Sequence, residues 1–397
     1  MIIKSLELEN FRNYGSLSMN FDSGTNILYG DNAQGKTNIL EAIYLSATTK
    51  SHKGSKDKDI VNFNAQEAHI RTYIEKDGLE HRVDMHLRKN KSKGIAINGQ
   101  KIKKAADLLG LLNVVFFSPE DLSIIKNGPA ERRRFVDMEL CQLDNVYLYN
   151  LNNYNKIVNQ RNKLLKELYF NPSLKDTLSV WDDQLVNYGI KIIERRIEFV
   201  KQLNEIIFDI HKRLSGGKEE LNVVYEPDVT VVDYENQLVI NRDRDIKLKQ
   251  TTIGPHRDDF CFMVKNAVNN ESHGIDNESE IVKNENFGNN DFKDNIIDIR
   301  KFGSQGQQRT AALSLKLSEI ELVKKITNDT PLLLLDDVLS ELDSNRQNYL
   351  LNSISDIQTI ITCTGLEEFV NNRFEINRVF RVSNATVIQE TADKNYR

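Results

Sequence analysis

The fold of this chain is decided by residues 30–37, which read Gly-Asp-Asn-Ala-Gln-Gly-Lys-Thr. The stretch matches the pattern GxxxxGK[ST] without deviation, and it lies between a short strand-like segment, 26–29, and a segment with helical spacing, 38–46. A strand, a glycine-rich turn and a helix form the context in which this pattern is a phosphate-binding loop. The glycines let the backbone wrap closely around phosphate oxygens, while amide hydrogens and the helix N-terminus supply positive potential. The sequence therefore predicts a nucleotide site, with a mere glycine-rich turn as the alternative.

Every residue of this P-loop is a candidate nucleotide contact. The lysine is expected to reach the β- and γ-phosphates, and the threonine hydroxyl to ligate Mg²⁺. The candidate set is Gly30, Asp31, Asn32, Ala33, Gln34, Gly35, Lys36 and Thr37.

Residues 332–337, Leu-Leu-Leu-Leu-Asp-Asp, fit the second half of such a site. An apolar strand of this kind delivers an acidic residue to the edge of the sheet beside the P-loop. Asp336 is expected to hold the Mg²⁺ directly or through water, and Asp337 to orient or deprotonate the attacking water. A buried strand running into a turn is the alternative, and the P-loop in the same chain disfavours it.

A second glycine-rich turn, 302–306, opens another helical segment, 307–325. A small, hydroxyl-bearing turn at a helix start is again suited to anions. It resembles the signature motif of ABC-type ATPases, with Ser304, Gly306 and Gln307 at matching positions. In that superfamily the element reaches the γ-phosphate bound by the other subunit, so the resemblance implies ATP held between two copies of the chain. Residues 340–343 resemble the D-loop that crosses the same interface.

Two positions depart from the ABC-type pattern. Cys363 stands where a switch histidine is usual, and Asp337 replaces the customary glutamate, which is one methylene longer. Both differences favour slow hydrolysis that acts as a timing switch.

The fold class expected from these motifs is α/β: an ABC-type ATPase head, which is a P-loop NTPase with a mixed sheet and helices, carrying an inserted and mainly helical arm. Long helical patterns begin at Pro129 and end near Gly216, and strand-like segments follow at 221–225 and 230–234. Residues 265–300 are rich in Asn and read as a mobile, low-complexity loop. The expected parts are the first section of the head at 1–125, the arm with its return strands at 126–264, the loop at 265–300, and the signature helix with the rest of the head at 301–397.

The composition of the chain limits which cofactors, locations and partners are possible. The chain has 397 residues, a net charge of −5 and three cysteines far apart in sequence, which argues against a disulfide framework or a zinc site. No apolar run reaches the roughly 18–20 residues that span a bilayer, and the first residues lack a signal-peptide layout, so we expect a cytoplasmic protein with no membrane contact. Residues 265–300 carry a charge of −4, which leaves −1 for the rest. The acidity of the chain therefore does not weigh against a DNA partner.

A longer series of motifs resembles the bacterial RecF family of DNA replication and repair proteins, relatives of SMC proteins and Rad50 without the long coiled coil. Besides the P-loop, signature and acidic strand, the series comprises residues 10–14, 117–122, 132–137, 160–165 and 254–259. The resemblance covers nearly the whole chain, apart from the Asn-rich stretch.

This resemblance implies an ATP-dependent dimeric clamp that binds gapped or junction DNA and, with RecO and RecR, helps to load RecA during repair and the SOS response. It implies a weak, Mg²⁺-dependent and DNA-stimulated ATPase with ATP and Mg²⁺ as cofactors. Lys36 and Asp337 are then catalytic, Thr37 and Asp336 hold the metal, and Ser304, Gly306 and Gln307 complete the opposite site. Arg12 is expected either to contact the nucleotide or to form a surface salt bridge.

DNA contact should depend on basic surface, because phosphate neutralisation dominates affinity. Two lysine-rich clusters supply the candidate contacts, Arg88, Lys89, Lys91, Lys93, Lys53 and Lys56. Charge runs of this kind are often only solvated faces. The alternative function is the energising ATPase of a membrane transporter, against which stand the missing switch histidine and the helical arm. A third candidate, an SMC-like chromosome protein, requires hundreds of coiled-coil residues that the chain lacks.

Overall fold

The parallel sheet at the centre of the head is built by the strands that flank the nucleotide motifs. The computed structural model describes residues 1–104, 107–266, 296–366 and 375–390. Within these residues the strand order is β15-β14-β3-β13-β12-β8, parallel except for the edge strand β15. The strands are β3 (Thr25–Tyr29), β8 (Val114–Phe117), β12 (Leu332–Asp336), β13 (Thr359–Cys363), β14 (Arg378–Ser383) and β15 (Thr386–Glu390). Four consecutive leucines form β12 because both faces of this sheet are covered.

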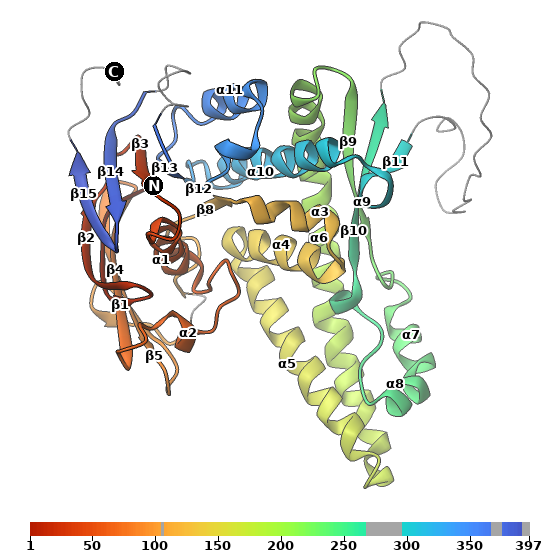
Figure 1. Cartoon of the computed structure of the whole chain (residues 1–397). Helices are drawn as coiled ribbons and strands as arrows, with labels where there is room; N and C mark the ends of the chain where they lie inside the picture. The colour runs from red at the N-terminus through yellow and green to blue at the C-terminus, as the bar shows by residue number, and fades with distance from the viewer. Residues whose placement is uncertain (105–106, 267–295, 367–374, 391–397) are drawn as a thin grey trace, which may run out of the picture.

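A second, antiparallel sheet covers one side of the head. Its order within the described residues is β2-β1-β4-β5-β6-β7. The strands are β1 (Ile2–Phe11), β2 (Tyr14–Asn20), β4 (Glu67–Lys76), β5 (Leu79–Arg88), β6 (Gly94–Ile97) and β7 (Gln100–Lys101). Helix α1 (Lys36–Thr48) lies between the two sheets, and Leu6, Ile39 and Leu334 belong to one continuous core (Figure 1).

The other face of the parallel sheet is covered by α10 (Gln305–Thr327) and α11 (Ser344–Ser353). Helix α10 is long and almost entirely buried from Thr310 to Ile320, because it also packs against the helices of the arm. The signature helix therefore belongs to both parts of the molecule, and any movement of the arm acts directly on it.

The arm projects from the head as a helical pair backed by a small sheet (Figure 1). Its helices are α4 (Pro129–Leu143), α5 (Asn145–Glu167) and α6 (Leu178–Leu214), and its sheet is β9 (Glu219–Glu226), β10 (Asp259–Asn266) and β11 (Ile296–Asp298). Helix α4 begins at Pro129, as the sequence predicted, since proline at the first turn loses no hydrogen bond. With 37 residues, α6 is about 55 Å long.

Short helices complete the described chain: α2 (Asp57–Ile60), α3 (Leu122–Lys126), α7 (Tyr234–Ile240), α8 (Arg242–Leu248) and α9 (Ile299–Phe302), with 3₁₀ turns η2 (Pro119–Asp121), η3 (Pro172–Thr177), η4 (Pro255–Arg257) and η5 (Leu339–Glu341). No helix in the described part is both long and apolar enough to cross a membrane.

Two sequence expectations differ from the structure. Residues 230–234 are not a strand: they form a turn that leads into α7, because the Thr230 hydroxyl bonds the Asp233 carboxylate at 2.6 Å and Asp233 starts the helix. At the two edges of the loop expected at 265–300, residues 265 and 266 belong to β10 and residues 296–300 to β11 and α9. The remaining part of this loop, 267–295, lies outside the described residues.

Candidate nucleotide site

The P-loop leaves β3 and wraps back over the start of α1 in a conformation that needs its two glycines. Gly30 and Gly35 have φ angles of 149° and 113°, which side chains rarely tolerate. A Cβ atom at Gly35 would lie 2.7 Å from the side-chain amide nitrogen (Nδ2) of Asn13. The buried Lys36 ammonium donates hydrogen bonds to the carbonyls of Gly30 and Asp31, the second at 3.0 Å. The Lys36 side chain therefore crosses the loop in which the motif predicts that phosphates bind.

The P-loop meets the acidic strand through one direct contact. The Thr37 hydroxyl donates to the Asp336 carboxylate at 2.9 Å, although 299 residues separate the two in sequence. Both groups are oxygen ligands, which Mg²⁺ prefers, and together they fit a site that also uses substrate phosphates. The residues predicted to hold the metal are thus brought side by side.

Asp337 follows directly in an uncommon backbone conformation, with φ of 55°. Partial burial raises the pKa of its carboxyl group, neighbouring Asp336 and Glu341 raise it further, and Lys36 opposes them. A carboxylate with a raised pKa accepts a proton more readily, which suits the role of general base.

Thr362, the residue before Cys363, contacts the aspartate pair. Its hydroxyl donates to Asp336 at 2.8 Å and accepts from the Asp337 amide at 3.0 Å. Cys363 is buried at the end of β13, and its carbonyl accepts from the Gly30 amide at 3.3 Å. Sequence reasoning concentrated on the cysteine at the switch position and missed this threonine. A hydroxyl residue at the carboxyl end of a buried strand was the signal that could have found it.

The signature turn is exposed and separate from the P-loop of the same chain. The Ser304 hydroxyl accepts from the Gln307 backbone amide at 3.2 Å, and the Gln307 side-chain oxygen accepts from the Ser304 backbone amide at 2.8 Å, so the two residues cap α10. Gly306 is also exposed. The start of α10 lies beside α9, close to the arm, whereas the P-loop lies at the start of α1 (Figure 1). The structure therefore does not bring Ser304, Gly306 and Gln307 together with Lys36.

The chain is similar to known proteins over nearly its whole length. A family model described as "RecF/RecN/SMC N terminal domain" matches residues 2–388. The DNA replication and repair protein RecF of Agathobacter rectalis is 62% identical over 382 residues, which are 96% of this chain and 97% of that protein. The protein of the same name from Lachnoclostridium phytofermentans is 60% identical over 387 residues, 98% and 99% of the two chains. The chain belongs to the RecF family.

Solved structures extend the likeness to three dimensions. A RecF described as the ATP-bound recombination mediator protein of the RecFOR pathway matches with a TM-score of 0.85 and 32% identity, over 98% of this chain and 97% of that one. An Smc head bound to the C-terminal winged-helix domain of ScpA matches with a TM-score of 0.55 and 17% identity, covering 99% of both chains, and supports the fold alone. The fold is that of the RecF and SMC heads, an ABC-type ATPase with a long helical insert, as expected from the sequence.

In this RecF-family chain Arg12 is engaged with the head itself. Its Nε and Nη2 atoms donate to the two oxygens of buried Glu41 at 2.8 and 2.7 Å, and further bonds reach Ser55 and the Asp59 carbonyl. Burial alone would raise the pKa of Glu41, but the bonds from Arg12 and Ser51 lower it overall. Of the two roles expected for Arg12, this geometry supports the salt bridge, which fastens the end of β1 to α1.

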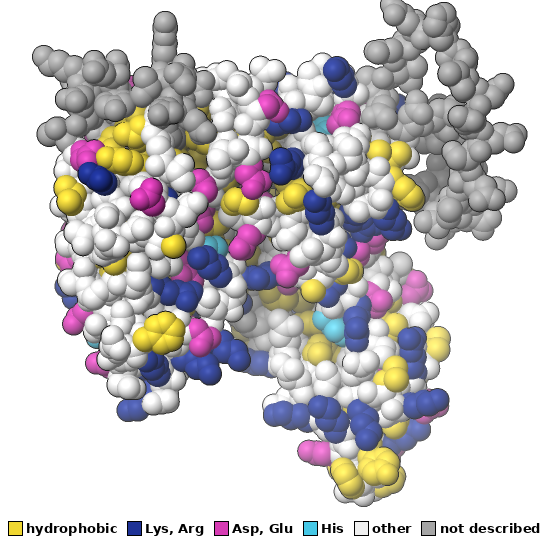
Figure 2. All heavy atoms as spheres, viewed as in Figure 1, with side chains coloured by type: hydrophobic (Ala, Val, Ile, Leu, Met, Phe, Trp, Pro, Cys, Tyr) yellow, Lys and Arg dark blue, Asp and Glu magenta, His cyan; other side chains and the backbone are white. Residues whose placement is uncertain are grey.

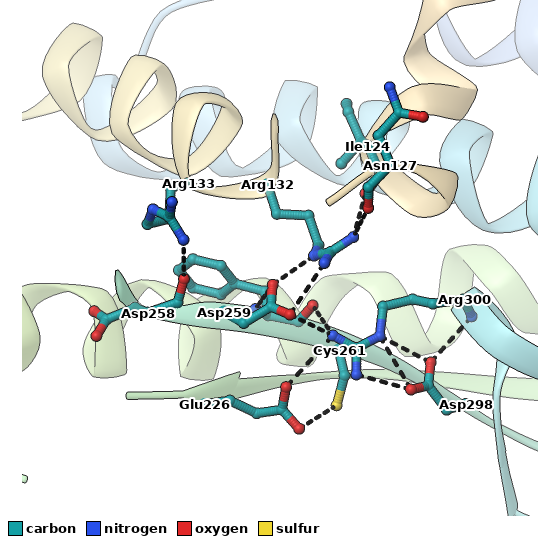
Figure 3. A network of polar contacts seen from close by, with 11 residues as sticks. Ile124, Asn127, Arg132, Arg133, Glu226, Asp258, Asp259, Cys261, Asp298 and Arg300 are labelled. Carbon is teal, nitrogen blue, oxygen red and sulfur yellow. Dashed lines mark hydrogen bonds and ion pairs between the residues drawn. The ribbon is translucent and has the colours of Figure 1, made fainter. Parts of the chain in front are cut away.

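Two RecF-like motifs, 132–137 and 254–259, meet in a polar network just before the signature turn (Figure 3). Arg132 donates to both oxygens of Asp259, at 2.6 and 3.0 Å, and Arg300 reaches the same carboxylate at 2.8 Å. Arg300 also bonds Asp298 at 2.8 Å. The network joins α4, β10 and α9, so these motifs fix the segment from which Ser304 starts.

The six lysines and arginines proposed for DNA binding fall into two groups. Arg88, Lys89 and Lys93 are partly used within the head, since they donate to the carbonyls of Ser92, Phe63 and Thr49, and Lys93 also pairs with Asp57 at 2.9 Å. The other three are exposed: Lys53, Lys56 and Lys91. Lys and Arg side chains gather on the edge of the head that faces the arm (Figure 2).

Proposed function

We propose that this chain is an ATP-dependent DNA-binding protein of recombinational repair and replication-fork maintenance, working as a homodimer with ATP held between two copies. The observation that carries the proposal is the contact between Thr37 and Asp336 at 2.9 Å, which assembles half of an ATPase site in the head. The exposed signature turn, separate from that half, is available to complete the site of a second copy.

In the proposed reaction the P-loop amides and Lys36 hold the β- and γ-phosphates and stabilise the charge that develops on them. Thr37 and Asp336 would hold Mg²⁺, which would neutralise phosphate charge. Asp337 orients the attacking water and accepts its proton. Ser304 and the α10 N-terminus of the partner close the site from the other side. Because Asp337 is shorter than glutamate and Cys363 is buried, hydrolysis is slow and resets the clamp.

The proposed partners follow from the family. RecF relatives are described as recombination mediators of the RecFOR pathway, which supports cooperation with RecO and RecR on gapped DNA, with RecA loaded downstream. DNA is recognised by its backbone and by the single-strand/duplex junction. This activity is cytoplasmic and requires no membrane.

Sedimentation of the full chain with and without ATP, Mg²⁺ and gapped DNA tests the proposal. We expect monomer alone, dimer with ATP, and a dimer–DNA complex with both ligands, together with a rise in ATP turnover when duplex DNA is added. A monomer under all conditions would refute the sandwich. ATP turnover that is indifferent to DNA would instead favour the transporter-type ATPase.

Replacing Asp337 with Asn should trap the ATP-bound dimer. The substitution keeps the size of the side chain but removes the proton acceptor, so turnover should fall about 100-fold or more while ATP still binds. The dimer should then persist on DNA long after wild type has dissociated. Asp209→Asn, an exposed change on α6, is the control and should leave turnover unchanged. Wild-type turnover in Asp337→Asn would remove Asp337 from the mechanism.

A further inference from the structure

A cavity of about 470 Å³ lies where the head meets the arm. The head contributes the end of α1 and the residues after it, Thr48, Thr49 and Lys50. The arm contributes α4, α5, α6 and the turn η4, including Arg133, Arg134, Arg196, Tyr154 and His256. Several lining residues come from the two RecF-like motifs, 132–137 and 254–259. The polar network near the signature turn gives a role to Arg132 and Asp259 of these motifs, but it gives none to the side chains that face this cavity.

The cavity carries an excess of positive charge. Among the described residues that line it, Asp137 is the one carboxylate, and it is engaged by Arg196 at 2.7 Å and by the Tyr147 hydroxyl at 2.5 Å. Arg196 in turn binds buried Asp258 at 2.6 Å. This buried set of one arginine and two aspartates carries a charge of −1. Lys50, Arg133 and Arg134 add three positive charges, and although Arg134 also lies 4.0 Å from the Glu131 carboxylate outside the lining, the sum remains positive.

These cations have N–H donors left over for a ligand. A guanidinium has five N–H donors. Arg133 uses one on the Asp258 carbonyl at 2.5 Å, and Arg134 bonds the His52 carbonyl at 2.8 Å from across the boundary between arm and head. Burial and nearby Arg196 lower the pKa of Arg133, while the carboxylates of Asp258, Asp137 and Asp259 oppose them. Lys50 is exposed at the rim. Arginine forks with free N–H groups match phosphate oxygens.

The cavity is also connected to the nucleotide site by one rigid element. Helix α1 starts with Lys36 in the P-loop and ends with Thr48 at the cavity, a span of about 20 Å for its 13 residues. Its core side chains are packed between the two sheets, so a shift at one end is transmitted to the other.

We propose that this cavity is a phosphate-binding site and that its ligand is the backbone of DNA, held by Lys50, Arg133 and Arg134. The proposal rests on the proposed function and adds the place where DNA acts on ATP turnover. A phosphodiester in the cavity draws the arm and the end of α1 together, and α1 carries the change to Lys36. Free phosphate or a nucleotide presents the same oxygens, so the test separates these sources from DNA.

The test compares two double variants that remove equal charge. The first is Lys50→Gln with Arg134→Gln; the second, the control, is Lys126→Gln with Lys201→Gln, which are exposed lysines outside the cavity. All four side chains are exposed, so both proteins should fold. Duplex DNA affinity is measured over a range of salt concentrations, and ATP turnover is measured with and without DNA.

The cavity variant should bind duplex DNA about 10-fold or more weakly, and the slope of log K against log salt should fall by nearly 2, about 0.9 for each lost phosphate contact. Its basal ATP turnover should stay at the wild-type value, whereas stimulation by DNA should disappear. The control should lose no more than about twofold in affinity. Wild-type slope and stimulation in the cavity variant would overturn the proposal.

Two further arms keep the outcomes distinct. If wild type itself fails to bind DNA, the proposed function falls, and the DNA ligand falls with it. Thermal melting with inorganic phosphate, and separately with ATP, is compared between wild type and the cavity variant. If phosphate or ATP protects wild type but not the variant, while both bind DNA equally, the cavity binds the small anion and DNA is excluded as its ligand.

Discussion

The P-loop and the polar centre of the arm hold charged groups in two different ways. In the P-loop, eight consecutive residues shape the backbone, and Lys36 bonds carbonyls only five and six positions away. In the arm, Arg196 binds Asp137 and Asp258, which are 59 and 62 positions away on α4 and before β10. The first is a device for function made of neighbouring residues. The second joins distant elements and exists only when the whole arm has folded.

A second buried cluster of one arginine and two aspartates lies near the tip of the arm. Buried Arg161 on α5 donates to Asp182 on α6 at 2.7 Å and to Asp245 on α8 at 2.6 Å. Removing one partner of a buried ion pair leaves an uncompensated charge, which is more costly than losing an exposed pair. The comparison therefore predicts that arginines in the arm control stability, whereas the P-loop lysine controls turnover.

The largest expected effect is on the arm. Arg196→Met leaves Asp137 and Asp258 without their shared cation and should reduce the free energy of unfolding by about 3–5 kcal/mol. Denaturant unfolding followed by circular dichroism measures the change.

The matched control is the preceding residue. Arg195 pairs with Asp144 at 2.9 Å, but both side chains are partly exposed, so Arg195→Met should cost no more than about 1 kcal/mol. Equal losses in the two variants would contradict the assignment of Arg196 as the centre of the arm.

The second effect falls on activity. Lys36→Met should lower ATP turnover about 100-fold or more, because it removes a charged donor from the developing phosphate charge. The free energy of unfolding should change little, since the hydrogen bonds that Lys36 makes within the described residues go to carbonyls of its own loop. Lys126→Met, an exposed lysine on α3, should keep normal turnover. A Lys36 variant as unstable as the Arg196 variant would erase the distinction between the two regions.

The same distinction explains what could be predicted from the sequence. The P-loop, the leucine strand and the α10 cap are runs of neighbouring residues whose pattern carries their conformation, and the structure has each of them. Proximity of Thr37 and Asp336 was expected, because the apolar strand was predicted to deliver Asp336 to the edge of the sheet beside the P-loop. The sequence at 230–234, with Val231 and Val232, favours a strand, but the hydrogen bond between Thr230 and Asp233 selects a turn.

Contacts between distant residues were beyond sequence reasoning. Nothing local marks Arg132 as the partner of Asp259, 127 positions away, or Thr362 as the residue that joins Asp336 and Asp337. Arg12 was open between two roles because its partner Glu41 is selected by the packing of α1 against the end of β1. Such pairs depend on which elements become neighbours, and that is settled by the burial of the core as a whole.

The smallest expected effect concerns Asp121, which lies between the two regions. Burial, with smaller contributions from nearby Glu319 and Glu120, raises the pKa of this carboxyl group to about 6, against the opposing effects of Lys316 of the signature helix and the Ser118 amide. Because this pKa exceeds the ordinary 3.8, the folded chain binds the proton more readily than the unfolded chain. The stabilisation is therefore complete below about pH 4 and is lost as the pH rises through 6.

Asp121→Asn removes this dependence: relative to wild type, the free energy of unfolding of the variant should rise by about 1 kcal/mol between pH 5 and pH 7.5. Denaturant unfolding at the two pH values measures the difference. If the free energy of unfolding of the variant relative to wild type is the same at both pH values, Lys316 keeps Asp121 ionised at both, and Asp121 acts as a fixed charge for the arm.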